Sequence, residues 1–191
     1  KKGAGSGDWL LMDSSGREVT TSVSKYRIMN WTQINPRDLR IIDPVFCYPS
    51  AILCREKAIV LNLEHIKAII TSEKVLLRNP TDENAIPVVQ ELRRVLKSEE
   101  RTDDPFEFRV LEVVLEGICS YLSARSIEMD NQVYPALDLL TSKITSRNFD
   151  DVRRLKSQIT RLTSRVHKVQ DELEKLLDDE YEMECLYLSR K

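Results

Sequence analysis

Carboxylates gather near the C-terminal end of the sequence, within the second of two long predicted helices. Eight acidic residues and a single lysine occupy positions 171 to 184; the acids are Asp171, Glu172, Glu174, Asp178, Asp179, Glu180, Glu182 and Glu184. Carboxylates at a helix C-terminus oppose the macrodipole and repel one another at i,i+4 spacing, each effect costing roughly a few tenths of a kcal/mol. A counter-charge is expected beside them: a divalent cation such as Mg2+, which prefers carboxylate and water oxygens, or the basic tract of a neighbouring subunit. The plainer alternative is a solvated acidic face.

The first half of the same predicted helix is basic. Its cations are Arg153, Arg154, Lys156, Arg161, Arg165 and Lys168. They have no interleaved aromatic residues and lie beside an apolar seam, so they are interpreted as a solvated or ion-paired face. The whole chain carries 29 Lys+Arg and 31 Asp+Glu, for a net charge of -2. This balance argues against a nucleic-acid partner.

The sequence offers little for enzymatic chemistry. Only two histidines are present, His65 and His167, and neither has a catalytic partner beside it in sequence. Three of the five glycines fall in the first seven residues, and no glycine-rich phosphate loop or EF-hand motif occurs. The four cysteines fit neither a zinc pattern nor a disulfide framework and are interpreted as thiols in a reducing compartment; they are Cys47, Cys54, Cys119 and Cys185. We therefore expect no enzyme.

Long helices are predicted to carry the charged segments. From Phe106 onward, apolar residues recur at helical spacing, and Pro135 is expected to kink this first helix. A second stripe steps by 3 and 4 without a miss through Val152, Leu155, Ile159, Leu162, Val166, Val169, Leu173 and Leu176. Such a stripe is typical of a coiled coil. With a turn at Ser146 or Asn148, the two helices form an antiparallel hairpin whose arms reach roughly 45 Å or more.

The first half of the chain favours short strands. Trp9 to Met12 and Glu18 to Thr21 suggest a β-hairpin, and a short helix is expected over Lys25 to Trp31. Four β-branched and aliphatic runs with short polar links predict an antiparallel meander; they are Ala51 to Arg55, Ala58 to Asn62, Ile66 to Thr71 and Lys74 to Arg78. A helix capped by Thr81 or Asp82 and running to about Ser98 follows the meander.

The predicted fold class is α+β: a mostly antiparallel β-sheet flanked by helices, followed by a long antiparallel helical hairpin. Three parts are expected along the chain. They are a flexible lead over 1–8, an α/β sheet subdomain over 9–104 and a helical hairpin subdomain over 105–191.

Several strings, in this order, resemble the soluble N-terminal part of CorA-type magnesium transporters of the plant and mitochondrial branch, and plant members most. They include Pro36-Arg-Asp-Leu-Arg40, Arg55-Glu-Lys-Ala-Ile-Val60, Ile66-Lys-Ala-Ile-Ile70, Pro105-Phe-Glu-Phe-Arg109, Tyr134-Pro-Ala-Leu-Asp138-Leu-Leu140, Thr160-Arg-Leu-Thr-Ser-Arg-Val166, Leu176-Leu-Asp-Asp179 and Leu186-Tyr-Leu-Ser-Arg-Lys191. The resemblance runs from about Trp9 to the end of the sequence.

The resemblance implies a homopentameric Mg2+ channel whose soluble domain senses Mg2+ bound between adjacent subunits. The Gly-Met-Asn signature of the pore is absent, and no membrane span occurs in the sequence. The chain is therefore expected to be a regulatory domain that ends before the stalk helix. The intact protein is expected in a chloroplast, mitochondrial or other plant membrane, with this domain on the cytosolic, stromal or matrix side.

The resemblance strengthens the cation hypothesis for Asp178, Asp179 and Glu180, and adds Glu64 and Asp138 as candidate Mg2+ ligands because they lie in family-like strings. A rival hypothesis from another class is a coiled-coil adaptor. It predicts association through apolar hairpin residues regardless of Mg2+.

Overall fold

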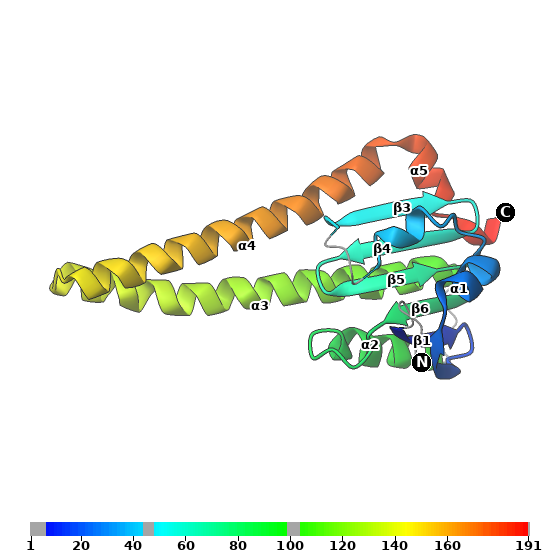
Figure 1. Ribbon diagram of the computed structural model, residues 1–191, viewed down its shortest axis with the longest axis horizontal. Helices are drawn as coiled ribbons and strands as arrows, with labels where there is room; N and C mark the ends of the chain where they lie inside the picture. The colour runs from blue at the N-terminus through cyan, green and yellow to red at the C-terminus, as the bar shows by residue number, and fades with distance from the viewer. Residues whose placement is uncertain (1–6, 44–47, 99–103, 191) are drawn as a thin grey trace.

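The computed structural model describes residues 7–43, 48–98 and 104–190. A β-sheet with helices on both faces forms a base, and two long helices project from it as an arm (Figure 1). The fold class is therefore α+β, as predicted. The expected flexible lead lies outside the described residues except for Gly7 and Asp8, which belong to the first strand. Cys47 also lies outside them.

The described residues form one six-stranded, fully antiparallel sheet with the order β2-β1-β6-β5-β4-β3. Its strands are β1 (Gly7–Asp13), β2 (Glu18–Val23), β3 (Ala51–Arg55), β4 (Ala58–Leu63), β5 (Ile66–Ile70) and β6 (Lys74–Arg78). The predicted hairpin and the predicted meander are both present. They join because β1 pairs with β6, with Trp9 opposite Arg78.

Both faces of the sheet are covered, which explains why every residue of β4 is buried. On one face, Trp9, Val60 and Ile69 pack with Ile28 and Leu39. These two come from α1 (Lys25–Thr32) and the 3-10 turn η1 (Asp38–Arg40). The other face receives α2 (Ile86–Lys97) and the long helices. Alternate side chains of the inner strands β1, β6, β5 and β4 thus enter separate cores.

The start of α2 differs from the prediction. Helix α2 begins at Ile86, and neither Thr81 nor Asp82 caps it. The Asp82 carboxylate instead accepts a hydrogen bond from the Asn84 backbone N–H at 2.9 Å, which forms a local turn. Pro87 lies in the first turn of the helix, as predicted, where its missing N–H costs nothing.

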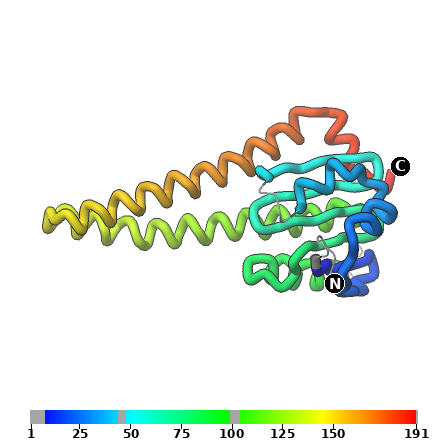
Figure 2. Tube along the Cα trace, viewed as in Figure 1, coloured from blue at the N-terminus to red at the C-terminus, as the bar shows by residue number. Residues whose placement is uncertain are grey.

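The arm is an antiparallel hairpin of α3 (Phe106–Ser142) and α4 (Ser146–Asp178). At about 1.5 Å per residue they extend roughly 55 and 50 Å, and the tube view shows how far they outreach the sheet (Figure 2). Helix α3 continues through Pro135, which does not end it. Among the described residues, no helix is both long and apolar enough to span a membrane.

Burial divides the arm along its length. The part of α3 that lies on the sheet, from Phe106 to Leu122, contains all eight buried residues of that helix. No residue from 123 to 154 is buried. The predicted stripe of α4 follows the same division, since Leu155, Val169 and Leu176 are buried whereas Ile159 and Val166 are exposed.

The second long helix ends earlier than its predicted acidic C-terminus. Helix α4 stops at Asp178, and a short helix α5 (Glu180–Cys185) starts after Asp179 and packs against β3. A last 3-10 turn, η2 (Leu188–Arg190), returns to the first turn of α3. There the buried Glu107 carboxylate accepts hydrogen bonds from the backbone N–H and the hydroxyl of Ser189, both at 2.7 Å.

Candidate metal-binding site

Three of the candidate ligands form the junction between α4 and α5, which we call the acidic elbow: Asp178, Asp179 and Glu180. All three residues are exposed. Asp179 serves as the N-cap of α5, because its Oδ1 accepts hydrogen bonds from the backbone N–H groups of Tyr181 at 2.9 Å and Glu182 at 3.1 Å. The elbow therefore places Asp178 and Glu180 on either side of a fixed cap.

The elbow changes the electrostatic argument drawn from the sequence. The prediction that these carboxylates oppose a helix dipole is wrong for Glu180 and Glu182, which lie in the first turn of α5. Carboxylates at a helix N-terminus are stabilised by the macrodipole. The favourable interaction with the dipole of α5 therefore offsets part of the repulsion between these carboxylates.

Two further acids of the run are tied to β3, the edge strand of the sheet. The Glu172 carboxylate accepts a hydrogen bond from the Ile52 backbone N–H at 3.4 Å and pairs with Lys175. Glu182 lies close enough to Cys54 to raise the pKa of that thiol, which burial and this negative charge together bring to about 12. Asp178 and Glu180, by contrast, make no side-chain hydrogen bond or ion pair within the described residues.

Glu64 lies at a different place, in the turn between β4 and β5. Its backbone has a positive φ of 53°, and its side chain is only 7% exposed. The carboxylate accepts hydrogen bonds from Arg165 of α4, with Nε at 2.8 Å, and the same guanidinium donates to the Tyr121 hydroxyl of α3 at 3.4 Å. We call these three side chains the joint, because they connect the sheet to both long helices.

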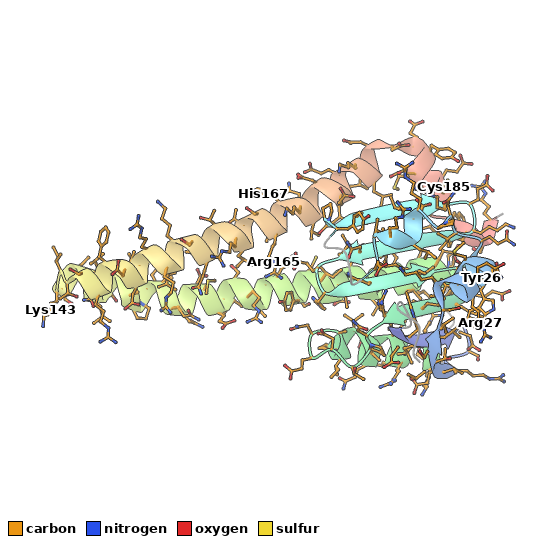
Figure 3. All side chains as sticks on the ribbon, in the orientation of Figure 1. Tyr26, Arg27, Lys143, Arg165, His167 and Cys185 are labelled. Atoms are coloured by element: carbon orange, nitrogen blue, oxygen red, sulfur yellow. The ribbon has the colours of Figure 1, made fainter. Side chains whose placement is uncertain are left out.

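His65 completes the surroundings of the joint. Its ring lies 4.4 Å from the Tyr121 ring, and both ring nitrogens are buried without a hydrogen-bond partner of good geometry. Burial holds the pKa of this imidazole below its usual value, although the nearby carboxylates of Asp82 and Glu64 act in the opposite direction. A neutral His65 therefore packs beneath the ion pair. Figure 3 shows Arg165 and His167 on opposite sides of α4, so the second histidine points away from the joint.

Asp138 lies near the far end of the arm, four residues before the end of α3. Asp138 is exposed. Because α4 spans 33 residues between that end and the elbow, Asp138 and Asp178 are separated by roughly 45 Å. The five predicted ligands consequently occupy three separate places in one subunit.

No group of three His, Cys, Asp or Glu side chains in the described residues is arranged to hold a metal ion. The predicted site between subunits stays a prediction, because it requires carboxylates from a second chain. Within one chain, Asp178 and Glu180 have the chemistry to hold a hydrated Mg2+ ion, which needs only one or two carboxylates and keeps several waters. The Glu64 carboxylate is already neutralised by Arg165.

Sequence reasoning missed the joint and the cap. Glu64 and Arg165 are 101 residues apart, and no local pattern connects them. The cap did have a signal: Asp179 followed three residues later by Glu182 matches the capping-box spacing that marks a helix start.

Comparison with known proteins identifies the relatives of the chain. A family model described as "Magnesium transporter MRS2-like" matches residues 10–191. The chain is 55% identical to magnesium transporter MRS2-2 of Arabidopsis thaliana, covering all of this chain and 55% of that protein. It is 55% identical to MRS2-7 of the same plant, covering 96% of this chain and 51% of the relative. It is 47% identical to MRS2-B of Oryza sativa subsp. indica, covering 100% of this chain and 44% of that relative.

These matches extend over the whole fold described above, from β1 to the acidic elbow and η2. The chain spans about half the length of the curated relatives it matches. The predicted resemblance to the plant branch is confirmed. The chain belongs to the MRS2-like family of magnesium transporters.

Proposed function

We propose that this chain is the Mg2+-responsive regulatory domain of a magnesium transporter. In this proposal the intact protein is a homopentamer that lets Mg2+ cross a membrane, and Mg2+ bound between neighbouring domains favours the closed state. The domain acts on the cytosolic, stromal or matrix side of a plant membrane. It catalyses no reaction and binds no nucleic acid.

The observation that carries this proposal is the acidic elbow in a chain related to magnesium transporters. Asp178 and Glu180 are exposed and have no hydrogen-bond or ion-pair partner in the described chain, so their oxygens are available to an ion. Two carboxylates beside a rigid cap lose little conformational freedom on binding. A neighbouring subunit that adds one more oxygen would then be drawn into contact by Mg2+ and released without it.

Thermal unfolding with increasing Mg2+ tests this function. The melting temperature should rise between zero and about 20 mM Mg2+ at constant ionic strength, because a ligand that binds only the folded state stabilises it by mass action. The rise should disappear in Asp178→Asn/Glu180→Gln. Asp179 is left unchanged in this variant so that the cap of α5 survives.

The matched control is Asp171→Asn/Glu174→Gln, which removes the same charge from exposed positions two turns earlier in α4. It should retain the Mg2+ response. An equal loss in both variants would assign the effect to general charge screening, and would contradict a site at the elbow. The titration is run at low and high protein concentration, because a site shared between subunits responds more strongly when the chains associate.

The second candidate function is a coiled-coil adaptor, which the exposed seam residues Ile159 and Val166 of α4 favour. An adaptor associates through these apolar residues whether or not Mg2+ is present. Sedimentation velocity with and without Mg2+ separates the two candidates. Association that ignores Mg2+ and is lost in Ile159→Ser/Val166→Ser would support the adaptor.

A further inference from the structure

The far end of the arm has an unusual composition. We call residues 139–149 the hairpin tip; they comprise the last turn of α3, the connection and the first turn of α4. The tip contains two cations, Lys143 and Arg147, and no Asp or Glu, although Asp138 directly precedes it and Asp150 directly follows it. Large apolar side chains are turned outward here: Ile144 is 86% exposed, Phe149 60% and Leu139 59%.

Exposed apolar groups this large are costly at a tip surrounded by water. Ile144 is the most exposed of the large hydrophobic residues in the described chain. Ile144 has no packing role within the hairpin, because it lies in the connection between the two helices. The arrangement points to contact with something outside the chain.

Side chains of the tip satisfy part of its backbone. The Asn148 amide donates to the carbonyls of Lys143 at 2.8 Å and Leu139 at 3.4 Å. The hydroxyls of Thr141 and Ser142 donate to carbonyls three residues earlier, and the Thr145 hydroxyl accepts from the Asn148 backbone N–H at 3.2 Å. Helix ends leave such groups without an intrahelical partner. Each group that a side chain satisfies lowers the free-energy cost of moving the turn out of water.

The position of the tip leaves it open to a large flat partner. Figure 3 shows Lys143 at the extreme end of the molecule, opposite the sheet and the residues Tyr26, Arg27 and Cys185. Neither Lys143 nor Arg147 forms an ion pair within the described residues. Two cations without an ion-pair partner and three outward apolar side chains thus meet at one projecting turn, between the flanking residues Asp138 and Asp150.

We propose that the hairpin tip docks on a lipid bilayer surface that contains anionic headgroups. Ile144 and Phe149 enter the boundary between headgroups and acyl chains, and Lys143 and Arg147 pair with lipid phosphates. Apolar side chains flanked by cations are the chemistry that such a surface recognises. A protein partner would have to cover a tip only one turn deep, whereas a bilayer contacts every outward side chain at once. The inference does not depend on the proposed Mg2+ response.

Flotation with vesicles tests the docking. The chain is mixed with vesicles of phosphatidylcholine alone or with about 30% phosphatidylglycerol, at low salt and at about 0.5 M salt, which screens surface charge. We expect the chain to float with the anionic vesicles at low salt. The floating fraction should decrease clearly at high salt and with vesicles of phosphatidylcholine alone. Lys143→Gln/Arg147→Gln should weaken the partition about 30-fold, since each cation near such a surface contributes about fivefold.

The variant Ile144→Ser/Phe149→Ser tests the apolar contribution and should reduce flotation at least as strongly. Its matched control is Val19→Ser/Tyr26→Ser, which removes two similarly exposed apolar side chains from the base. Circular dichroism verifies that all variants keep their helix content. Because every substituted residue is exposed, folding should be unaffected.

Three outcomes overturn the proposal. One is the absence of flotation for the parent chain with anionic vesicles. Another is equal loss in the tip and base variants, which would indicate unspecific adsorption. The third is a loss of self-association, measured by sedimentation without lipid, in the Ile144/Phe149 variant while flotation stays unchanged. That result would assign the tip to a second copy of the chain.

Discussion

Helix α3 passes through two different environments, and the contrast between them explains much of the molecule. Its first half lies on the sheet and buries Val110, Val114 and Ile118 completely. Its second half runs alongside α4 beyond the sheet (Figure 1), and no residue from 123 to 154 is buried. One continuous helix is therefore held by a core at one end and by a single seam at the other.

The two ends depend on different forces. The base relies on burial, which contributes most of the stability of a folded domain. The distal arm relies on local interactions, such as the Thr145 cap of α4 and the exposed pairs Arg125–Glu128 and Arg154–Asp151. Each of these contributes far less than the burial of a large apolar side chain, because exposed pairs are screened by solvent and a cap satisfies only one or two backbone groups. Secure folding near the sheet thus coexists with a weakly held projection.

The largest expected effect comes from truncating one apolar side chain in each half of α3. Ile118→Ala should destabilise the protein by about 3 kcal/mol, because the side chain is fully buried and leaves a cavity. Leu137→Ala, at a position 41% exposed, should change stability by less than about 0.5 kcal/mol. Urea unfolding of both variants measures the difference. Equal losses would mean that the distal arm is as well packed as the base.

A smaller effect is expected at the joint. Arg165→Met should cost about 2 kcal/mol, because it leaves the buried Glu64 carboxylate unpaired, although the partial exposure of Arg165 reduces the loss. A double-mutant cycle with Glu64→Gln should give a coupling of about 1 kcal/mol. The same cycle on Arg125 and Glu128 in the arm serves as the control, and should give a smaller coupling because both side chains are exposed and screened by solvent. Coupling that is larger in the arm would reverse the comparison.

The smallest expected effect concerns the two helix caps. Asp179→Ala should cost about 1 kcal/mol by removing the N-cap of α5, whereas Asp179→Asn should be nearly neutral because asparagine caps equally well. Thr145→Ala, in the arm, should loosen the start of α4 locally with little change in global unfolding. Hydrogen exchange resolved by segment distinguishes these cases. Protection lost across the base after Thr145→Ala would show that the arm and base unfold together.

Much of the fold was predictable because its signals are local. All four strands of the meander lie where the runs of β-branched and aliphatic residues predicted them, and the long hairpin follows the apolar stripe. The end of α4 was not predicted, since the stripe of apolar residues continues to Leu176 and says nothing of a new cap at Asp179. The start of α2 was also misplaced, because Asp82 caps a turn in place of a helix. In both places, the backbone hydrogen bonds that a short polar side chain accepts determine which of two local structures forms.

The candidate site was less predictable because it depends on contacts between distant residues. The sequence shows where carboxylates cluster. Burial and ion pairing, which the sequence does not show, determine which of them are available to bind a cation. Glu64 is neutralised by Arg165, Asp179 is used as a cap, and Asp178 and Glu180 stay open. No local pattern marks the role of Glu107, whose carboxylate accepts two hydrogen bonds from Ser189 near the end of the described residues.

The point where burial ends turns the arm into a lever. Leu122 is the last buried residue of α3, and the helix continues to Ser142, so the tip lies roughly 30 Å beyond this point. A bend of about 10° there displaces the tip by about 5 Å, close to one helical turn. A bend that leaves the packed half of α3 in place is therefore amplified into a large movement at the end of the arm.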